Sequence, residues 1–153
     1  MISKRELRIG LIRSKIEQIY NSLAFIEENL PAEFGEFNKS KVIRNAIYKE
    51  TEFVVELFLD VCAVINSDLG LGIPEAEENI LDNLESKQIL DKNIIEIIKQ
   101  IKKFRNILVH KYGKINDETA FDDIKEGLKD FELIIKEIEK FLEKHKIKKN
   151  SGN

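Results

Sequence analysis

The chain has 153 residues, of which 42% are hydrophobic and 35% charged, and it contains two prolines and no tryptophan. This length fits one domain with a real core, and the composition is typical of a soluble, mostly helical protein. The formal net charge of −3 argues against a general nucleic-acid binder, and the single cysteine, Cys62, excludes a disulfide framework and fits a reducing compartment.

The first predicted element is a long amphipathic helix over about residues 4–30. Pro31 should end it, and the link 31–40 is rich in turn residues, with Asn38 or Ser40 available to cap the next helix. The first ten residues show no long apolar run before a small-residue cleavage site, so we expect a cytoplasmic protein without a secretory signal. The apolar stripe of the helix has the spacing of three and four residues that a helix requires: Ile9, Ile12, Ile16, Ile19, Leu23, Ile26 and Leu30.

A second long helix is predicted over about residues 40–66. Its apolar stripe is interrupted by Glu50, which is a candidate buried partner for a cation. The stretch 53–65 is apolar but contains two acids and is too short to cross a bilayer, and we expect Cys62 to pack there. A polar row on another face has the pattern of a solvated surface: Lys49, Glu52, Glu56 and Asp60.

The remaining elements are a short helix at about residues 75–84, a central helix capped by Asp91, and a last long helix capped by Asn116. Gly113 is placed to end the central helix. We expect one domain over residues 1–143 and a basic, disordered tail over 144–153. Four long helices and one short one predict an all-α, up-and-down bundle.

The central helix carries the most unusual charge in the chain. Residues 99–115 contain six basic side chains and no acid, although the whole chain is net negative. The apolar stripe through Ile94, Ile98, Ile101 and Leu108 also places Arg105 and Tyr112 on the core side. Because a buried charge costs several kcal/mol unless it is paired, Arg105 should hold an ion-pair partner or an anionic ligand.

Arg105 and His110 together suit a phosphodiester. His145 falls in the expected tail, so His110 is the credible group titrating near neutral pH, whereas arginine binds phosphate through a planar fork of donors. A histidine can deprotonate the ribose 2′-hydroxyl or protonate the leaving oxygen while arginine neutralises the charge on phosphorus. This chemistry cleaves RNA without a metal or cofactor, and it spares DNA.

One histidine supplies only one proton-transfer role, so a symmetric homodimer is expected to provide the acid and the base together. Residues five apart on a regular helix point about 140° away from each other. His110 is therefore expected to reach an anion on Arg105 only if the helix unwinds near Gly113 or a partner chain contributes. Asn106 shares a face with His110 and could orient the imidazole or bind phosphate.

Other interpretations remain open on the pattern alone. Arg105 could be purely structural and paired with Glu50, and Tyr112 could be a packing residue. The chain could also be a non-catalytic helical module that binds a nucleotide or a protein partner. A metal site is less well supported, because one histidine and one distant cysteine lack ligand spacing.

The segment FRNILVHKY, residues 104–112, resembles the signature of the HEPN superfamily and specifically of the HepT-like toxins. Arg105 is followed by Asn106, four residues separate Arg105 from His110, and Tyr112 comes two residues after the histidine. The helix carrying Ala46, Glu56 and Asp60 and the run from residue 89 to 98 are also similar to that family. One departure is Tyr48 and Lys49, where an acidic and then a basic residue are expected.

This resemblance implies a dimerising all-α bundle that acts as a metal-independent endoribonuclease toxin on RNA such as tRNA or mRNA. It implies that Arg105 binds phosphate, that His110 is the acid–base residue, and that Asn106 supports them. The implied partner is a minimal nucleotidyltransferase antitoxin of the MntA type, which transfers AMP to Tyr112 and forms a hetero-oligomer with the toxin. The added negative charge would repel RNA.

Overall fold

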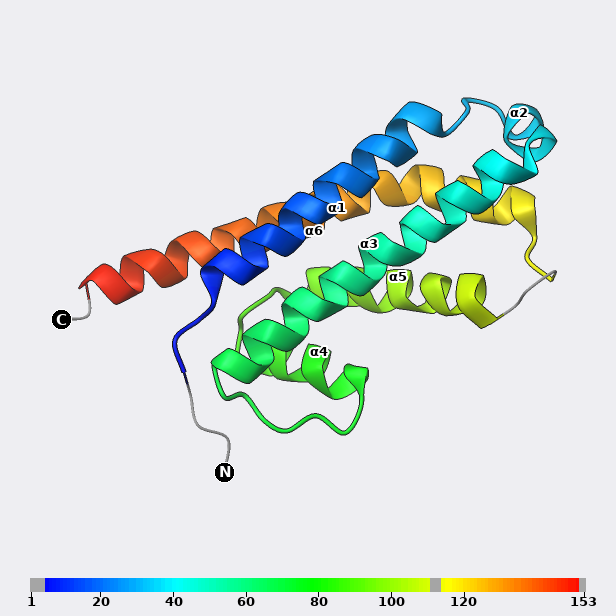
Figure 1. Cartoon of the computed structure of the whole chain (residues 1–153). Coiled ribbons are helices and arrows are strands. Elements are labelled where there is room, and N and C mark those ends of the chain that lie inside the picture. Colours follow the sequence, from blue (N-terminus) through cyan, green and yellow to red (C-terminus); the bar gives the residue numbers. More distant parts are fainter. Residues whose placement is uncertain (1–4, 111–113, 152–153) are drawn as a thin grey trace.

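The computed structural model describes residues 5–110 and 114–151, and all regular elements in these two ranges are helices. Four long helices lie lengthwise against one another, with one short helix near each end of the bundle (Figure 1). The predicted all-α bundle is confirmed, with two short helices instead of one. The elements are α1 (Ile9–Asn29), α2 (Phe34–Lys39), α3 (Lys41–Asp68), α4 (Glu77–Ser86), α5 (Lys92–His110) and α6 (Asp117–Ser151).

Helix α3 is the centre of the packing, because it contacts α1, α2, α4 and α5. Its buried residues occupy most of its circumference, whereas α1 buries only one stripe. A helix that is apolar nearly all round is stable only when other elements cover it, which α1, α4 and α5 do here. Cys62 is fully buried in this core as predicted, and burial raises the pKa of its thiol to about 12.

The predicted link after α1 contains a helix, α2. Phe37 is fully buried there, and its ring centroid lies 5.1 Å from that of Phe121 on α6. Because the two rings anchor the segment to the core, its turn-forming sequence forms a helix of 6 residues rather than an open link. Ser40 caps α3 as predicted, since its hydroxyl accepts a hydrogen bond from the Ile43 amide at 3.2 Å.

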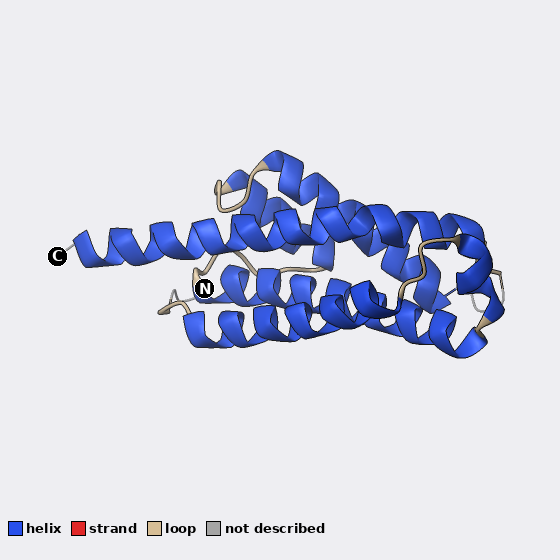
Figure 2. Cartoon of the chain, turned by 90° about the horizontal axis from the view of Figure 1, so that it is seen from above, coloured by secondary structure: helices blue, strands red, loops and turns tan. Residues whose placement is uncertain are grey.

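Helix α6 is longer than expected. Asn116 caps its start through the Thr119 amide at 3.0 Å, as predicted, but the helix continues to Ser151 through most of the segment expected to be a disordered tail. Lysine is a good helix former, and cations near a helix C-terminus interact favourably with the helix dipole. Lys149 also pairs with Glu6. Figure 2 shows this end of α6 extending beyond the other long helices.

The segment before α1 is a strap that crosses the end of α3, which explains why α1 begins at Ile9 and not near residue 4. Arg5 and Arg8 both bind the buried carboxylate of Asp68, with Nε of Arg5 and Nη2 of Arg8 each 3.0 Å from Oδ1. The Arg8 amide donates to Oδ2 at 3.0 Å. Burial would raise the pKa of Asp68, but the bonds from Arg8 and the charge of Arg5 outweigh it and lower the pKa.

Helix α4 is held against α3 by a chain of amide hydrogen bonds. Asn83 donates to Asn66 at 3.0 Å, and Asn66 donates to the Gly72 carbonyl at 3.0 Å. Gly70 has φ of 62° and Gly72 has φ of 144°, so both occupy conformations that favour glycine and make the turn predicted after α3. Through this turn α4 comes to lie beside α5. Within the described ranges, no helix is long and apolar enough to cross a membrane.

Candidate functional site

A hollow of about 390 Å³ lies beside the second half of α5, where the predicted site residues are. Lys102, Asn106 and Val109 form its centre, since their spacing places them on one helical stripe. Arg105 and His110 lie on either side of that stripe and both line the hollow. The structure therefore brings the two predicted residues to one hollow from opposite flanks, with α5 still helical through His110.

Arg105 is mostly buried, with 14% of its side chain exposed, and it is paired. Its Nη2 lies 3.1 Å from Oε2 of Glu77 on α4, and its Nη1 lies 3.9 Å from Oε1 of Glu56 on α3. The predicted need for a counter-charge is met, but by these two acids and not by Glu50, so that pairing was wrong. Glu56 projects from α3 toward α5, whereas α4 supplies the closer carboxylate.

The Nε atom of Arg105 is buried and has no hydrogen-bond partner in the described part of the chain. A buried, unpaired donor on a charged group costs about 1–3 kcal/mol. The guanidinium is thus held by carboxylates at its exposed edge only. A phosphate oxygen accepts hydrogen bonds as a carboxylate does, so the edge that binds Glu77 is also the edge that can bind an anion.

The basic stretch of α5 is partly neutralised by the acids of α4. Lys102 lies 3.0 Å from Glu78 and 3.7 Å from Glu77, and Lys99 lies 3.0 Å from Asp82. The hydrogen bond to Asp82 raises the pKa of Lys99. The local excess of positive charge is therefore smaller than the sequence of α5 alone indicates, and an anionic ligand would have to compete with α4 for these cations.

His110 and Asn106 have no side-chain hydrogen bond to another described residue. His110 is exposed and Asn106 is half-buried, so both side chains can turn toward a ligand in the hollow. Asn106 lies one turn before His110, which agrees with the predicted shared face. Tyr112, the predicted modification site, and Gly113, the predicted helix terminator, lie outside the described residues.

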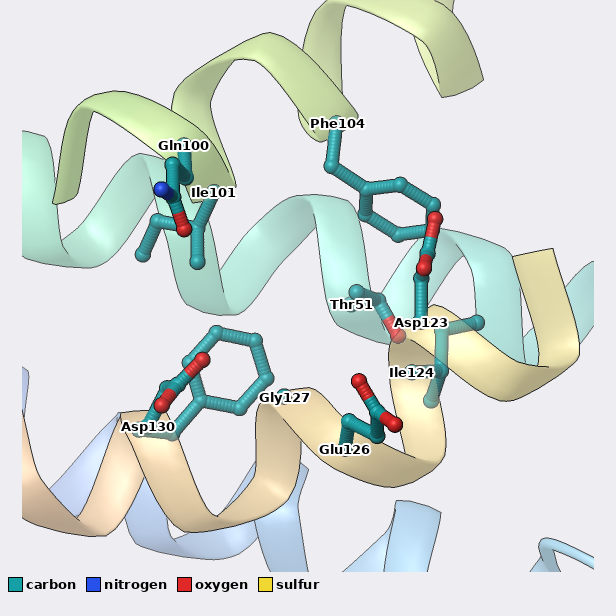
Figure 3. Close-up of a pocket in the computed structure, with 10 residues that line it drawn as sticks. Thr51, Gln100, Ile101, Phe104, Asp123, Ile124, Glu126, Gly127 and Asp130 are labelled. Atoms are coloured by element: carbon teal, nitrogen blue, oxygen red, sulfur yellow. The ribbon is translucent and has the colours of Figure 1, made fainter. Parts of the chain in front are cut away.

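A different hollow of about 230 Å³ lies between α5 and α6 over α3 (Figure 3). Its floor is apolar, with Phe104 and Ile101 from α5. Its outer edge is acidic, because α6 contributes three carboxylates to it: Asp123, Glu126 and Asp130. These carboxylates would repel a phosphodiester, so this hollow is not a candidate for the RNA-cleaving site.

Two residues of the candidate site, Glu56 and Glu77, were not predicted from the sequence to pair with Arg105. Glu56 was assigned to a solvated polar row, and Glu77 fell within the predicted short helix at residues 75–84 without an assigned role. Glu56 lies one turn after Glu52 on α3 and faces α5, but no local pattern shows which helix lies opposite. In the described ranges, no three His, Cys, Asp or Glu side chains are grouped so that they could hold a metal ion.

Known proteins are similar to this chain in sequence and in fold. Residues 19–138 match the family described as ribonuclease HepT-like. The mRNA nuclease HepT of Shewanella oneidensis is 22% identical over 125 residues, which are 82% of this chain and 93% of that protein.

Two solved structures are similar to most of this chain. One is the tri-AMPylated S. oneidensis HEPN toxin in complex with MNT antitoxin, with a TM-score of 0.75, 23% identity and coverage of 84% of this chain and 96% of that one. The other is the cytosolic protein YutE of Bacillus subtilis, with a TM-score of 0.75, 16% identity and coverage of 91% and 93%. These likenesses confirm the predicted HEPN-like bundle as the fold.

Proposed function

The chain belongs to the ribonuclease HepT-like family, and from this premise we propose that it is a metal-independent endoribonuclease toxin whose active site is the hollow beside Arg105. The family match confirms the family and the enzyme class predicted from residues 104–112. The observation that carries the proposal is that Arg105, Asn106 and His110 line one hollow, with a guanidinium edge that already binds a carboxylate.

The reaction uses the 2′-hydroxyl of the RNA as nucleophile. One imidazole takes the proton of that hydroxyl while its oxygen bonds to phosphorus, and the bond from phosphorus to the 5′-oxygen breaks. A second imidazole, in its protonated form, donates a proton to the departing 5′-oxygen. The phosphate replaces the Glu77 carboxylate at Arg105. The guanidinium then binds the non-bridging oxygens, where negative charge gathers. The products are a 2′,3′-cyclic phosphate and a 5′-hydroxyl end.

The second imidazole comes from the partner subunit of a homodimer. Among the described residues, His110 is the one histidine that lines the hollow. His145 lies in the second half of α6. A two-fold axis beside α5 would face two such hollows toward each other and bring together an acid and a base. Ile107, which is 38% exposed on α5 next to Asn106, gives this face an apolar contact.

The proposed partner is an antitoxin of the minimal nucleotidyltransferase class. The similar S. oneidensis structure is described as an AMPylated HEPN toxin in complex with MNT antitoxin. In this chain AMP would be joined through its phosphate to the Tyr112 hydroxyl, with release of pyrophosphate from ATP. The added anionic phosphodiester would repel RNA from the neighbouring hollow and inhibit cleavage.

Cleavage should depend on His110. With a defined tRNA and EDTA present, we expect His110→Ala to lower kcat/KM at least 100-fold, because one proton transfer is lost. His145→Ala is the matched control and should cleave normally, and a DNA strand of the same sequence should stay intact. Products are resolved on a denaturing gel. Equal rates of cleavage by His110→Ala and the parent protein would contradict the proposed reaction. No cleavage by either protein would favour a non-catalytic nucleotide-binding module.

The same variant tests whether the site is shared. When excess His110→Ala protein is exchanged into a fixed amount of parent, each heterodimer contains only one copy of His110, so the activity of the parent should fall steeply. Independent active sites would instead leave its activity unchanged. Gel filtration of each protein reports the dimer.

Modification should map to Tyr112. With a cognate nucleotidyltransferase and ATP, we expect the mass of AMP to be added to the parent chain and not to Tyr112→Phe. Tyr20→Phe is the control, since Tyr20 is 48% exposed on α1 and should not matter. Tyr48 is a poor acceptor, because its hydroxyl donates to Asp117 at 2.5 Å. Full labelling of Tyr112→Phe would place the modification elsewhere.

A further inference from the structure

A third hollow, of about 490 Å³, opens where the first turns of α3 and α6 meet the last turns of α5. We name it the Lys41 hollow, after the residue at its outer edge. Its polar lining comes mostly from one face of α3, with Asp117 from α6; the α3 residues are Lys41, Arg44, Asn45, Tyr48, Lys49 and Glu52. Figure 1 shows the starts of α3 and α6 at the same end of the bundle.

The Lys41 hollow continues the Arg105 hollow along the junction of α3 and α5. On α3, Glu52 lines the Lys41 hollow and Glu56 lines the Arg105 hollow, and the two residues are one helical turn apart. On α5, Leu108 lines the Lys41 hollow and lies one turn beyond Arg105. The near edges of the two hollows therefore adjoin, whereas Lys41 lies fifteen residues from Glu56 on α3, which is about 22 Å along the helix.

The lining of the Lys41 hollow favours an anion. Three of its side chains are cations, and both of its acids are already engaged. Glu52 lies 3.2 Å from Lys49, and Asp117 accepts from the Tyr48 hydroxyl and lies 3.8 Å from Nε of Arg44. Lys41 is exposed and has no ion pair or side-chain hydrogen bond within the described part of the chain.

The helix ends add to this positive potential. Helix α3 begins at Lys41 and α6 begins at Asp117, so the N-termini of two helices converge on the hollow. Each N-terminus carries a partial positive charge. The ring of Tyr48 lines the same hollow, and aromatic rings in basic grooves provide surfaces on which single-stranded bases stack.

We propose that the Lys41 hollow is a binding subsite for the nucleotides that flank the scissile phosphate in a single-stranded RNA substrate. Lys41 and Lys49 each contact one phosphate of this flanking segment, and Arg44, held by the Asn38 carbonyl at 3.0 Å, adds a fixed positive charge. This inference rests on the proposed ribonuclease function and names the form of RNA that the site takes. A strand that offers only the scissile phosphate lacks the contact with the Lys41 hollow.

The test separates binding from cleavage. A fluorescein-labelled oligoribonucleotide with 2′-O-methyl groups at each position cannot be cleaved by 2′-hydroxyl attack, and its binding is followed by anisotropy from 50 to 200 mM salt. We expect the Lys41→Ala, Lys49→Ala double variant to bind about tenfold more weakly at low salt, and its log–log salt slope to be shallower by about 1.4 because two phosphate contacts are lost.

The matched control is the Lys129→Ala, Lys136→Ala double variant, which has the same net charge and changes two exposed lysines on α6. It should bind almost as the parent does. Equal losses in the two double variants would overturn the subsite, because only total charge would then matter.

Cleavage is measured separately with unmodified RNA. A dinucleotide has only the scissile phosphate, so the double variant at Lys41 and Lys49 should cleave it at the parental rate and cleave a longer strand more slowly. Parental cleavage of both substrates overturns the subsite alone. Lysine-dependent binding without any cleavage by the parent protein supports the subsite and overturns the proposed function.

Discussion

At the scale of single residues, Arg105 is a cation already occupied by carboxylates. Glu77 lies 3.1 Å from the guanidinium edge and also 3.7 Å from Lys102, so one acid neutralises two of the cations that RNA would contact. A phosphate entering the hollow has to replace this carboxylate. The resting site is therefore held in shape by the groups with which the substrate competes.

This competition predicts the effect of Glu77→Gln. Removing the charge while keeping the shape should tighten binding of the uncleavable 2′-O-methyl strand by about three- to tenfold at low salt, and screening should reduce the gain at high salt. Anisotropy titration measures both. Glu75→Gln is the control, because Glu75 is a neighbouring exposed acid outside the hollow. Weaker binding by Glu77→Gln would show that Glu77 positions Arg105 instead of competing with RNA.

The neighbouring residues of the motif show how far a local pattern extends. Spacing along α5 placed Asn106 and His110 on one face, and both line the hollow. The angle of about 140° between Arg105 and His110 predicted either unwinding near Gly113 or a contribution from a partner chain, and the two residues flank one hollow on a helix that is regular through His110. Helical angles describe directions at the backbone, whereas the width of a hollow spans several side chains.

At the scale of elements, the strap before α1 has a clear energetic role. Asp68 ends α3 and is fully buried, and an acid at a helix C-terminus interacts unfavourably with the helix dipole. Arg5 and Arg8 offset this cost by pairing with it. The contact ties the start of the chain to the end of α3 and so fixes where α1 begins.

Asp68→Asn should destabilise the fold by about 2 kcal/mol at pH 7, because two arginines lose a buried counter-charge. The pKa of Asp68 is lower in the folded protein than in the unfolded chain, so its contribution is present above the unfolded value of about 3.9 and is lost as the pH falls toward the folded value. The difference between the variant and the parent should therefore shrink in acid.

Urea unfolding of both proteins from pH 7 down to pH 3 measures that difference. Asp60→Asn is the control, since Asp60 is exposed and pairs only at 3.4 Å with Lys15. A difference for Asp68→Asn that stays constant over this range would mean that packing, and not ionisation, stabilises the strap.

Helix α4 shows how one short element sets the chemistry of another. The bonds from Asn83 to Asn66 and from Asn66 to Gly72 dock α4 on α3, and this docking places its acids over the cations of α5. Lys99, Lys102 and Arg105 all find partners there. The position of α4 therefore determines how much positive charge the site presents to RNA.

At the scale of the whole molecule, charge is divided between faces of the bundle. The hollow in Figure 3 is edged by acids of α6, whereas the Arg105 and Lys41 hollows follow the junction of α3 and α5 and carry the cations. In the proposed mode of binding, this acidic chain would bind RNA along one path and repel it elsewhere. The proposed two-fold axis beside α5 would bring two such paths together.

The sequence by itself determined the features that depend on neighbours along the chain. The apolar stripes predicted the four long helices, Ser40 and Asn116 were identified as caps, and Cys62 was assigned to the core. The motif from Arg105 onward indicated the family, because its residues stand at fixed spacing in the sequence, and Arg105, Asn106 and His110 lie on one helix. These signals are local, since helical periodicity and capping involve residues only three or four apart.

Only the tertiary structure decided which groups meet across helices. Arg105 needed a counter-charge, but its pairing with Glu77 and Glu56 rather than Glu50 follows from the docking of α4, which no local spacing encodes. The helical α2 and the extension of α6 to Ser151 likewise depend on contacts between distant segments, the rings of Phe37 and Phe121 and the pair of Lys149 with Glu6. A stripe specifies which face is buried, and packing then selects its partner.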